Sequence, residues 1–109
     1  MEDLSSFSRV VSSDFKEPGN PIYLVGVTKN ELGGSEYFRI KKVAGIGSVP
    51  KVEAESASTL YRTLNRVLDQ PFARACHDIS DGGLAVALAE MSFGGGYGAD
   101  VSLPAIFEN

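Results

Sequence analysis

The stretch ACHDISDGGLAVALAEM, residues 75–91, joins an acidic, glycine-containing turn directly to a segment that is almost entirely apolar. The pattern predicts a helix over residues 82–93, in which apolar residues cover every side and Glu90 is the only charge. A helix that is apolar all round is typical of a protein interior. We therefore expect a buried helix that begins at the acidic turn and ends at the glycines of residues 94–96.

Outward from this stretch, helical and extended patterns alternate. Residues 53–69 carry apolar side chains at the i, i+3, i+4 spacing of an amphipathic helix, and a helical turn is expected over 35–40. Apolar or alternating runs predict strands, which are expected at residues 8–15, 21–28, 72–80 and 98–103. The expected fold class is α+β, with helices packed on a mostly antiparallel or mixed sheet. An edge of that sheet is expected to lack a partner strand, and an unpaired edge invites association, so a homodimer is expected.

Length and composition exclude several classes of protein. A chain of 109 residues with 43% hydrophobic and 22% charged residues predicts one globular domain over residues 1–109. The net charge of -4 argues against nucleic-acid binding. The single cysteine excludes an internal disulfide, and no Cys/His spacing indicates zinc. No apolar run reaches the roughly 20 residues of a membrane span, and the first residues are not expected to act as a signal peptide, so a cytoplasmic protein without a membrane partner is expected.

Two glycine-containing stretches are candidate ligand sites: ELGGSEY at residues 31–37 and HDISDGG at 77–83. The second lies at a helix start, where about four unpaired backbone N–H groups and the helix dipole suit phosphate. Asp81 is expected to cap the helix, and the two glycines after it let a ligand approach the backbone. A capped helix after a tight turn explains the same residues equally well. Asp78 favours a ligand, because two carboxylates near a phosphate can hold magnesium or a ribose hydroxyl.

Three segments, YLVGVTKNELGGSEYFR, VPKVEAESASTLYRTL and HDISDGGLAVALAEM, resemble in order and spacing the synthetase subunit of phosphoribosylformylglycinamidine synthase, an enzyme of purine biosynthesis. The resemblance runs roughly from Asp14 to Leu103. It points to the second C-terminal-type domain of that subunit, in the superfamily shared with aminoimidazole ribonucleotide synthetase. It implies the fold of such a domain, here incomplete, and hence a fragment of a longer polypeptide.

The resemblance implies a ligase that converts formylglycinamide ribonucleotide, ATP and glutamine-derived ammonia into formylglycinamidine ribonucleotide, ADP and phosphate. The residues that carry over to the family's LGGS loop and HDxSDGG turn are expected to bind the substrate's phosphate or ribose; they are Gly33, Gly34, Ser35, Asp78, Ser80, Asp81, Gly82 and Gly83. The family's catalytic histidine and magnesium-binding acidic residues lie in an ATP-binding domain with no counterpart here. No catalytic or metal-binding residue, and no activity of this chain alone, is therefore expected. ATP and magnesium are expected as cofactors of the parent enzyme, and its remaining domains and the glutaminase subunit are expected as partners.

Ordinary explanations remain for the other reactive side chains. A lone histidine at a strand end, such as His77, is more often hydrogen-bonded than catalytic. Cys76 has no neighbouring cation that would activate its thiol. Lys51 follows a glycine-containing loop that lacks the spacing of a phosphate-binding loop. Two other functions stay open: a non-catalytic assembly domain, or another chemistry of the superfamily, namely selenophosphate synthesis, thiamine monophosphate phosphorylation or aminoimidazole ring closure. The ELGGSEY motif argues against the second.

Overall fold

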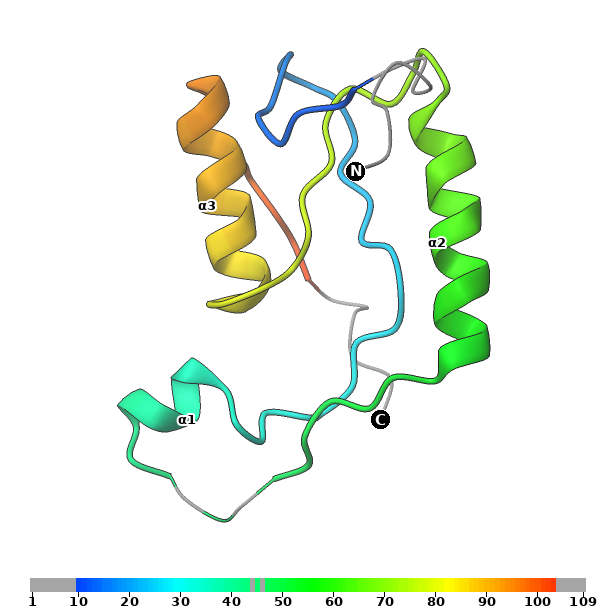
Figure 1. The fold of residues 1–109 in the computed structure, drawn as a ribbon. Helices are drawn as coiled ribbons and strands as arrows, with labels where there is room; N and C mark the ends of the chain where they lie inside the picture. Colours follow the sequence, from blue (N-terminus) through cyan, green and yellow to red (C-terminus); the bar gives the residue numbers. More distant parts are fainter. Residues whose placement is uncertain (1–9, 44, 46, 104–109) are drawn as a thin grey trace.

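The structure, a computed structural model, describes residues 10–43, 45 and 47–103. Its regular elements are three helices, α1 (Glu36–Ile40), α2 (Ala54–Leu68) and α3 (Gly83–Gly95). Long segments without regular secondary structure join them and run between α2 and α3 (Figure 1). None of the three helices packs directly against another. The irregular segments therefore hold the helices in place.

All three predicted helices are confirmed, and each has a local cause. The short helix α1 is capped by Ser35, whose hydroxyl accepts a hydrogen bond from the Phe38 N–H at 3.3 Å. The amphipathic helix α2 has Glu55 in its first turn and Arg66 in its last, the signs that complement the helix dipole. The helix α3 ends at Gly96, which takes the left-handed conformation at φ 69° that glycine adopts without strain.

The predicted α+β fold is wrong, because none of residues 10–43, 45 and 47–103 forms a strand. The predicted strands at 21–28, 72–80 and 98–103 have no regular secondary structure, and neither has the described part of the one expected at 8–15; residues 8 and 9 lie outside the described residues. A strand needs a repeated ladder of backbone hydrogen bonds to a neighbour. Residues 21–28 have the β-branched side chains of a strand but form no such ladder. Gly26, at φ 108°, also bends this segment at its centre.

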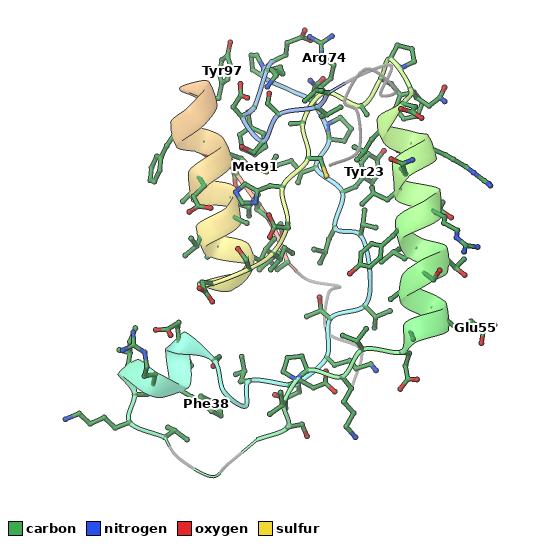
Figure 2. All side chains as sticks on the ribbon, in the orientation of Figure 1. Tyr23, Phe38, Glu55, Arg74, Met91 and Tyr97 are labelled. Atoms are coloured by element: carbon green, nitrogen blue, oxygen red, sulfur yellow. The ribbon has the colours of Figure 1, made fainter. Side chains whose placement is uncertain are left out.

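The apolar side chains of the described residues are largely exposed. Ala87 of α3, at 6% exposure, is their one buried hydrophobic residue. By contrast, the exposed fractions of Tyr23, Val27 and Phe93 are 80%, 82% and 81%. The prediction that α3 is buried on all sides is therefore wrong, and segment 21–28 is largely exposed as well. One side of α3 faces the rest of the molecule, as Met91 does in Figure 2, and the opposite side is open.

The N-terminal segment, residues 10–17, packs against the C-terminal half of α3 and braces it. The Phe15 N–H donates a hydrogen bond to the Met91 carbonyl at 3.1 Å. A Cβ atom placed on Gly95 would collide with the backbone carbonyl of Phe15. Only glycine therefore permits this approach between α3 and the segment beside it.

The same N-terminal segment is joined to residues 72–80. The Cys76 N–H donates to the Ser12 carbonyl at 3.2 Å, and an ion pair links Arg74 to Glu17 at 2.7 Å. Figure 2 shows Arg74 beside this segment. The N-terminal segment therefore contacts both α3 and the extended chain that leads into it.

Candidate functional site

The LGGS loop precedes α1, and its first glycine has a structural role. Gly33 is buried, and its N–H donates to the Ser48 carbonyl at 2.8 Å. A Cβ atom on Gly33 would lie 2.7 Å from that carbonyl group. Gly34 is exposed, has φ 76°, and no described residue accepts a hydrogen bond from its N–H. Gly34 is therefore the glycine of this loop that keeps a backbone donor for a ligand.

Ser35 is already engaged within the loop. Its N–H donates to the Leu32 carbonyl at 3.1 Å, while its hydroxyl caps α1. Glu36 and Arg39, three residues apart on the surface of α1, form an ion pair in which Arg39 Nε donates to Glu36 Oε2 at 2.7 Å. This bond to Glu36 raises the pKa of the Arg39 guanidinium, which therefore stays charged. The first turn of α1 is consequently fixed by local contacts.

The SDGG turn, residues 80–83, leads directly into α3. Gly82 and Gly83 have φ angles of 88° and 70°, and the Gly83 N–H donates to the Ser80 carbonyl at 3.0 Å. Gly82 is the N-cap residue, and no side chain caps the helix. The hypothesis that Asp81 caps α3 is therefore wrong. Because the first turn of α3 also has no acidic residue, its N-terminal N–H groups are left with their positive partial charge.

His77 is hydrogen-bonded next to this turn. Its Nε2 atom lies 2.9 Å from Oε2 of Glu90, and its Nδ1 atom lies 2.7 Å from the Asp78 carbonyl oxygen. The His77 side chain is 15% exposed, whereas that of Asp78 is 85% exposed. The histidine is thus a largely enclosed link to α3, and the Asp78 carboxylate is open to a ligand.

The two candidate loops are not brought into contact. No hydrogen bond or ion pair among the described residues joins residues 33–35 to residues 78–83. In Figure 1, α1 lies beyond the N-terminal end of α3, and the two helices do not touch. Each loop therefore presents its own set of ligand-binding groups.

A further surface feature lies on α2, apart from both glycine loops. An open groove on α2 is lined by Glu55, Ser56, Thr59, Leu60 and Thr63. It contains no residue of either glycine loop. In the described part of the chain, no three His, Cys, Asp or Glu side chains gather closely enough to hold a metal ion. Nor is any helix there long and apolar enough to cross a membrane.

Comparisons with known proteins point to one family. Residues 17–109 match the family described as AIR synthase related protein, C-terminal domain. The chain is 38% identical over 94 residues to phosphoribosylformylglycinamidine synthase subunit PurL of Thermococcus sibiricus, an alignment that covers 86% of this chain and 13% of that protein. It is 33% identical over 100 residues to the same subunit of Caldanaerobacter subterraneus subsp. tengcongensis, covering 92% of this chain and 14% of that protein.

A third relative, the same subunit of Methanobrevibacter smithii, is 35% identical over 106 residues, covering 94% of this chain and 15% of that protein. The chain thus spans between 13% and 15% of the length of these curated relatives. No solved structure matches it.

Proposed function

The chain belongs to the AIR synthase related C-terminal domain family, and on that premise we propose that it is a substrate-binding domain of a phosphoribosylformylglycinamidine synthase. The observation that carries the proposal is the match to PurL subunits, at 38% identity for the Thermococcus sibiricus protein. These matches cover most of this chain, which confirms the resemblance based on its three motifs. The reaction proposed for the whole enzyme is the conversion of formylglycinamide ribonucleotide to formylglycinamidine ribonucleotide in purine biosynthesis.

The start of α3 supports a role in binding the substrate's phosphate. Its N-terminal N–H groups have no side-chain cap and no acidic neighbour in the first turn. Gly82 and Gly83 leave the backbone accessible, since neither has a side chain. Uncapped N–H groups at a helix start are well suited to a phosphate group. We assign the phosphate to this turn and the ribose hydroxyls to the exposed carboxylates of Asp78 and Asp81.

The LGGS loop contributes fewer ligand-binding groups to the proposed site than the SDGG turn does. Gly34 supplies a free backbone donor, and Ser35 lies beside it at the start of α1. Gly33 contributes by shape alone, because its own N–H is bound to Ser48. Since the two loops are separate in this chain, we propose that they contact different parts of the substrate.

Catalysis is assigned to other parts of the synthetase. No three His, Cys, Asp or Glu side chains among the described residues gather closely enough to hold a metal ion, and no step is assigned to ATP or magnesium here. We propose that ATP and magnesium bind to the remaining domains and that ammonia comes from the glutaminase subunit. The chain alone is then expected to release no phosphate from ATP.

An amide NMR titration with formylglycinamide ribonucleotide tests the proposal. Shifts are expected at Gly34, Ser35 and residues 81–83, together with the N–H groups of the first turn of α3. The dephosphorylated ribonucleoside is the matched control, and it should lose the shifts at the SDGG turn while keeping those caused by the ribose. A folded sample without shifts in either loop would refute substrate binding by this chain.

The exposed apolar side chains favour a second function, an assembly domain. Tyr23, Val27 and Phe93 are each at least 80% exposed, and burial of such side chains against a partner would favour association. An assembly domain would associate with itself or with other synthetase domains without binding the ribonucleotide. Sedimentation velocity, measured on the sample used for NMR, distinguishes the two functions.

A further inference from the structure

We propose that His77 is a positioning residue that fixes the SDGG turn against α3 by binding Glu90. The role of the turn in substrate binding rests on the proposed function, whereas the link itself rests on geometry alone. His77 comes just before the turn, and Glu90 lies two helical turns into α3. The contact between them therefore closes the reversal by which the chain enters the helix (Figure 1).

The turn needs such a link because its own backbone is weakly constrained. Gly82 and Gly83 are both in the left-handed region, where glycine is free but also has the most conformational entropy to lose. Before the helix begins, the described structure shows one backbone hydrogen bond within residues 80–83. It runs from the Gly83 N–H to the Ser80 carbonyl at 3.0 Å. No side chain caps α3. Local contacts alone therefore leave the direction of the N-terminal N–H groups poorly defined.

The ring of His77 supplies the missing constraint. Nε2 lies 2.9 Å from the Glu90 carboxylate and Nδ1 lies 2.7 Å from the Asp78 carbonyl oxygen. Both partners are acceptors, so both contacts are hydrogen bonds only when each ring nitrogen carries a proton. The ring thus bridges a carboxylate of the helix and a carbonyl of the turn. At 15% exposure it is also held by its surroundings.

The position of Glu90 supports the same conclusion. It is the only charged residue among the 13 residues of α3, whose other side chains are apolar or small apart from Ser92. A lone carboxylate on such a helix gains nothing from apolar packing, and its contact is with His77. The charged groups recorded against the ring are those of Glu90 and Asp78. Glu90 thus acts by binding His77 and not by stabilising α3 itself.

Positioning and simple electrostatics predict opposite effects for one substitution. Glu90→Gln removes a negative charge near a site for an anion, so electrostatics alone would strengthen binding of the ribonucleotide. If Glu90 instead holds His77 and the turn, the same variant weakens binding. Glu90→Asp keeps the charge but withdraws the carboxylate from the ring. If Glu90 positions the turn, Glu90→Asp should therefore weaken binding as Glu90→Gln does. If only the charge of Glu90 matters, Glu90→Asp should bind the ribonucleotide as the wild type does.

The experiment measures amide hydrogen exchange without ligand and ribonucleotide affinity by NMR for the wild type, both Glu90 variants and His77→Gln. Exchange at residues 82–84 should accelerate, and affinity should fall, by about fivefold in all three variants, the size expected for one hydrogen bond of about 1 kcal/mol. Glu55→Gln, an exposed carboxylate at the start of α2, is the matched control and should change neither quantity.

Other outcomes overturn the proposal. Exchange at residues 82–84 that matches the wild type in Glu90→Gln and Glu90→Asp would show that the link does not fix the turn. Tighter binding by Glu90→Gln with wild-type affinity in Glu90→Asp would assign the effect to charge. If the wild type binds no ribonucleotide, the proposed function fails, and the exchange measurement still decides the role of His77. Should one variant fail to fold, the other two carry the exchange measurement, and exchange at residues 82–84 that matches the wild type in both would count against the link.

Discussion

At the scale of single residues, the glycines of the chain serve different purposes that sequence alone does not separate. The motif LGGS identified Gly33 and Gly34 together as ligand-binding glycines. In the structure, Gly33 is buried against Ser48, while the Gly34 N–H is free of partners among the described residues. The sequence could not reveal this difference, because the contact joins residues that no local pattern relates. The same holds for the contact between His77 and Glu90.

The close approach at Gly33 predicts a specific loss of stability. Gly33→Ala would place a methyl group 2.7 Å from the Ser48 carbonyl, and the resulting displacement should cost about 1–3 kcal/mol of unfolding free energy. Gly98→Ala is the matched control, because nothing lies within 4 Å of a Cβ atom there. Urea unfolding of both variants measures the difference. Equal midpoints would show that the loop relaxes freely around Gly33.

Asp14 predicts a pH dependence. Its hydrogen bonds from Lys16 and then from Ser12 lower its carboxyl pKa from 3.8 to about 2. A depressed carboxyl pKa contributes stability above the unfolded value, and this contribution is lost as pH falls through the folded value. An NMR titration of Asp14 should therefore show a midpoint near pH 2, and Lys16→Met should move it back towards 3.8. A wild-type midpoint close to 3.8 would exclude the contact with Lys16 in solution.

At the scale of secondary structure, the helices were predictable and the strands were not. Helix signals are local: the Ser35 cap, the apolar spacing of α2 and the glycines after α3 all act within a few residues. A strand depends on a partner elsewhere in the chain. Segment 21–28 has strand-forming residues but no ladder, so its composition alone led to the wrong fold class.

The two helix starts predict contrasting effects of cap substitutions. Ser35→Ala removes the hydroxyl that accepts a hydrogen bond from the Phe38 N–H and should destabilise α1 by about 1 kcal/mol. Because α1 has only five residues, this loss should unfold it. Asp81→Ala should leave α3 unchanged, because no side chain caps that helix. Backbone chemical shifts report both helices. Loss of helical shifts at the start of α3 in Asp81→Ala would contradict the observed N-cap.

At the scale of the whole molecule, the described chain has little hydrophobic core. Ala87 is buried at 6% exposure, while Phe93 on the same helix is 81% exposed. The composition, with 43% hydrophobic residues, provides enough apolar side chains for a core. It could not show how those residues are distributed between interior and surface, since that depends on contacts between distant segments.

This arrangement predicts where α3 tolerates larger side chains. Ala87→Leu should destabilise the chain by about 1–3 kcal/mol, because the side chain has no room on the enclosed side of the helix. Ala85→Leu, on the exposed side, should change the unfolding free energy by less than about 0.5 kcal/mol. Thermal unfolding followed by circular dichroism compares them. Equal losses would place both alanines in similar surroundings.

The hydrogen bond between Phe15 and Met91 also sets an order of events during synthesis. The N-terminal segment leaves the ribosome first, but its partner on α3 follows only after 76 further residues (91 − 15 = 76). At about 5–20 residues per second, that delay is roughly 4–15 s. Throughout this interval, the segment that later braces α3 is a nascent chain without its partner. The brace therefore cannot form before the C-terminal half of α3 has been made.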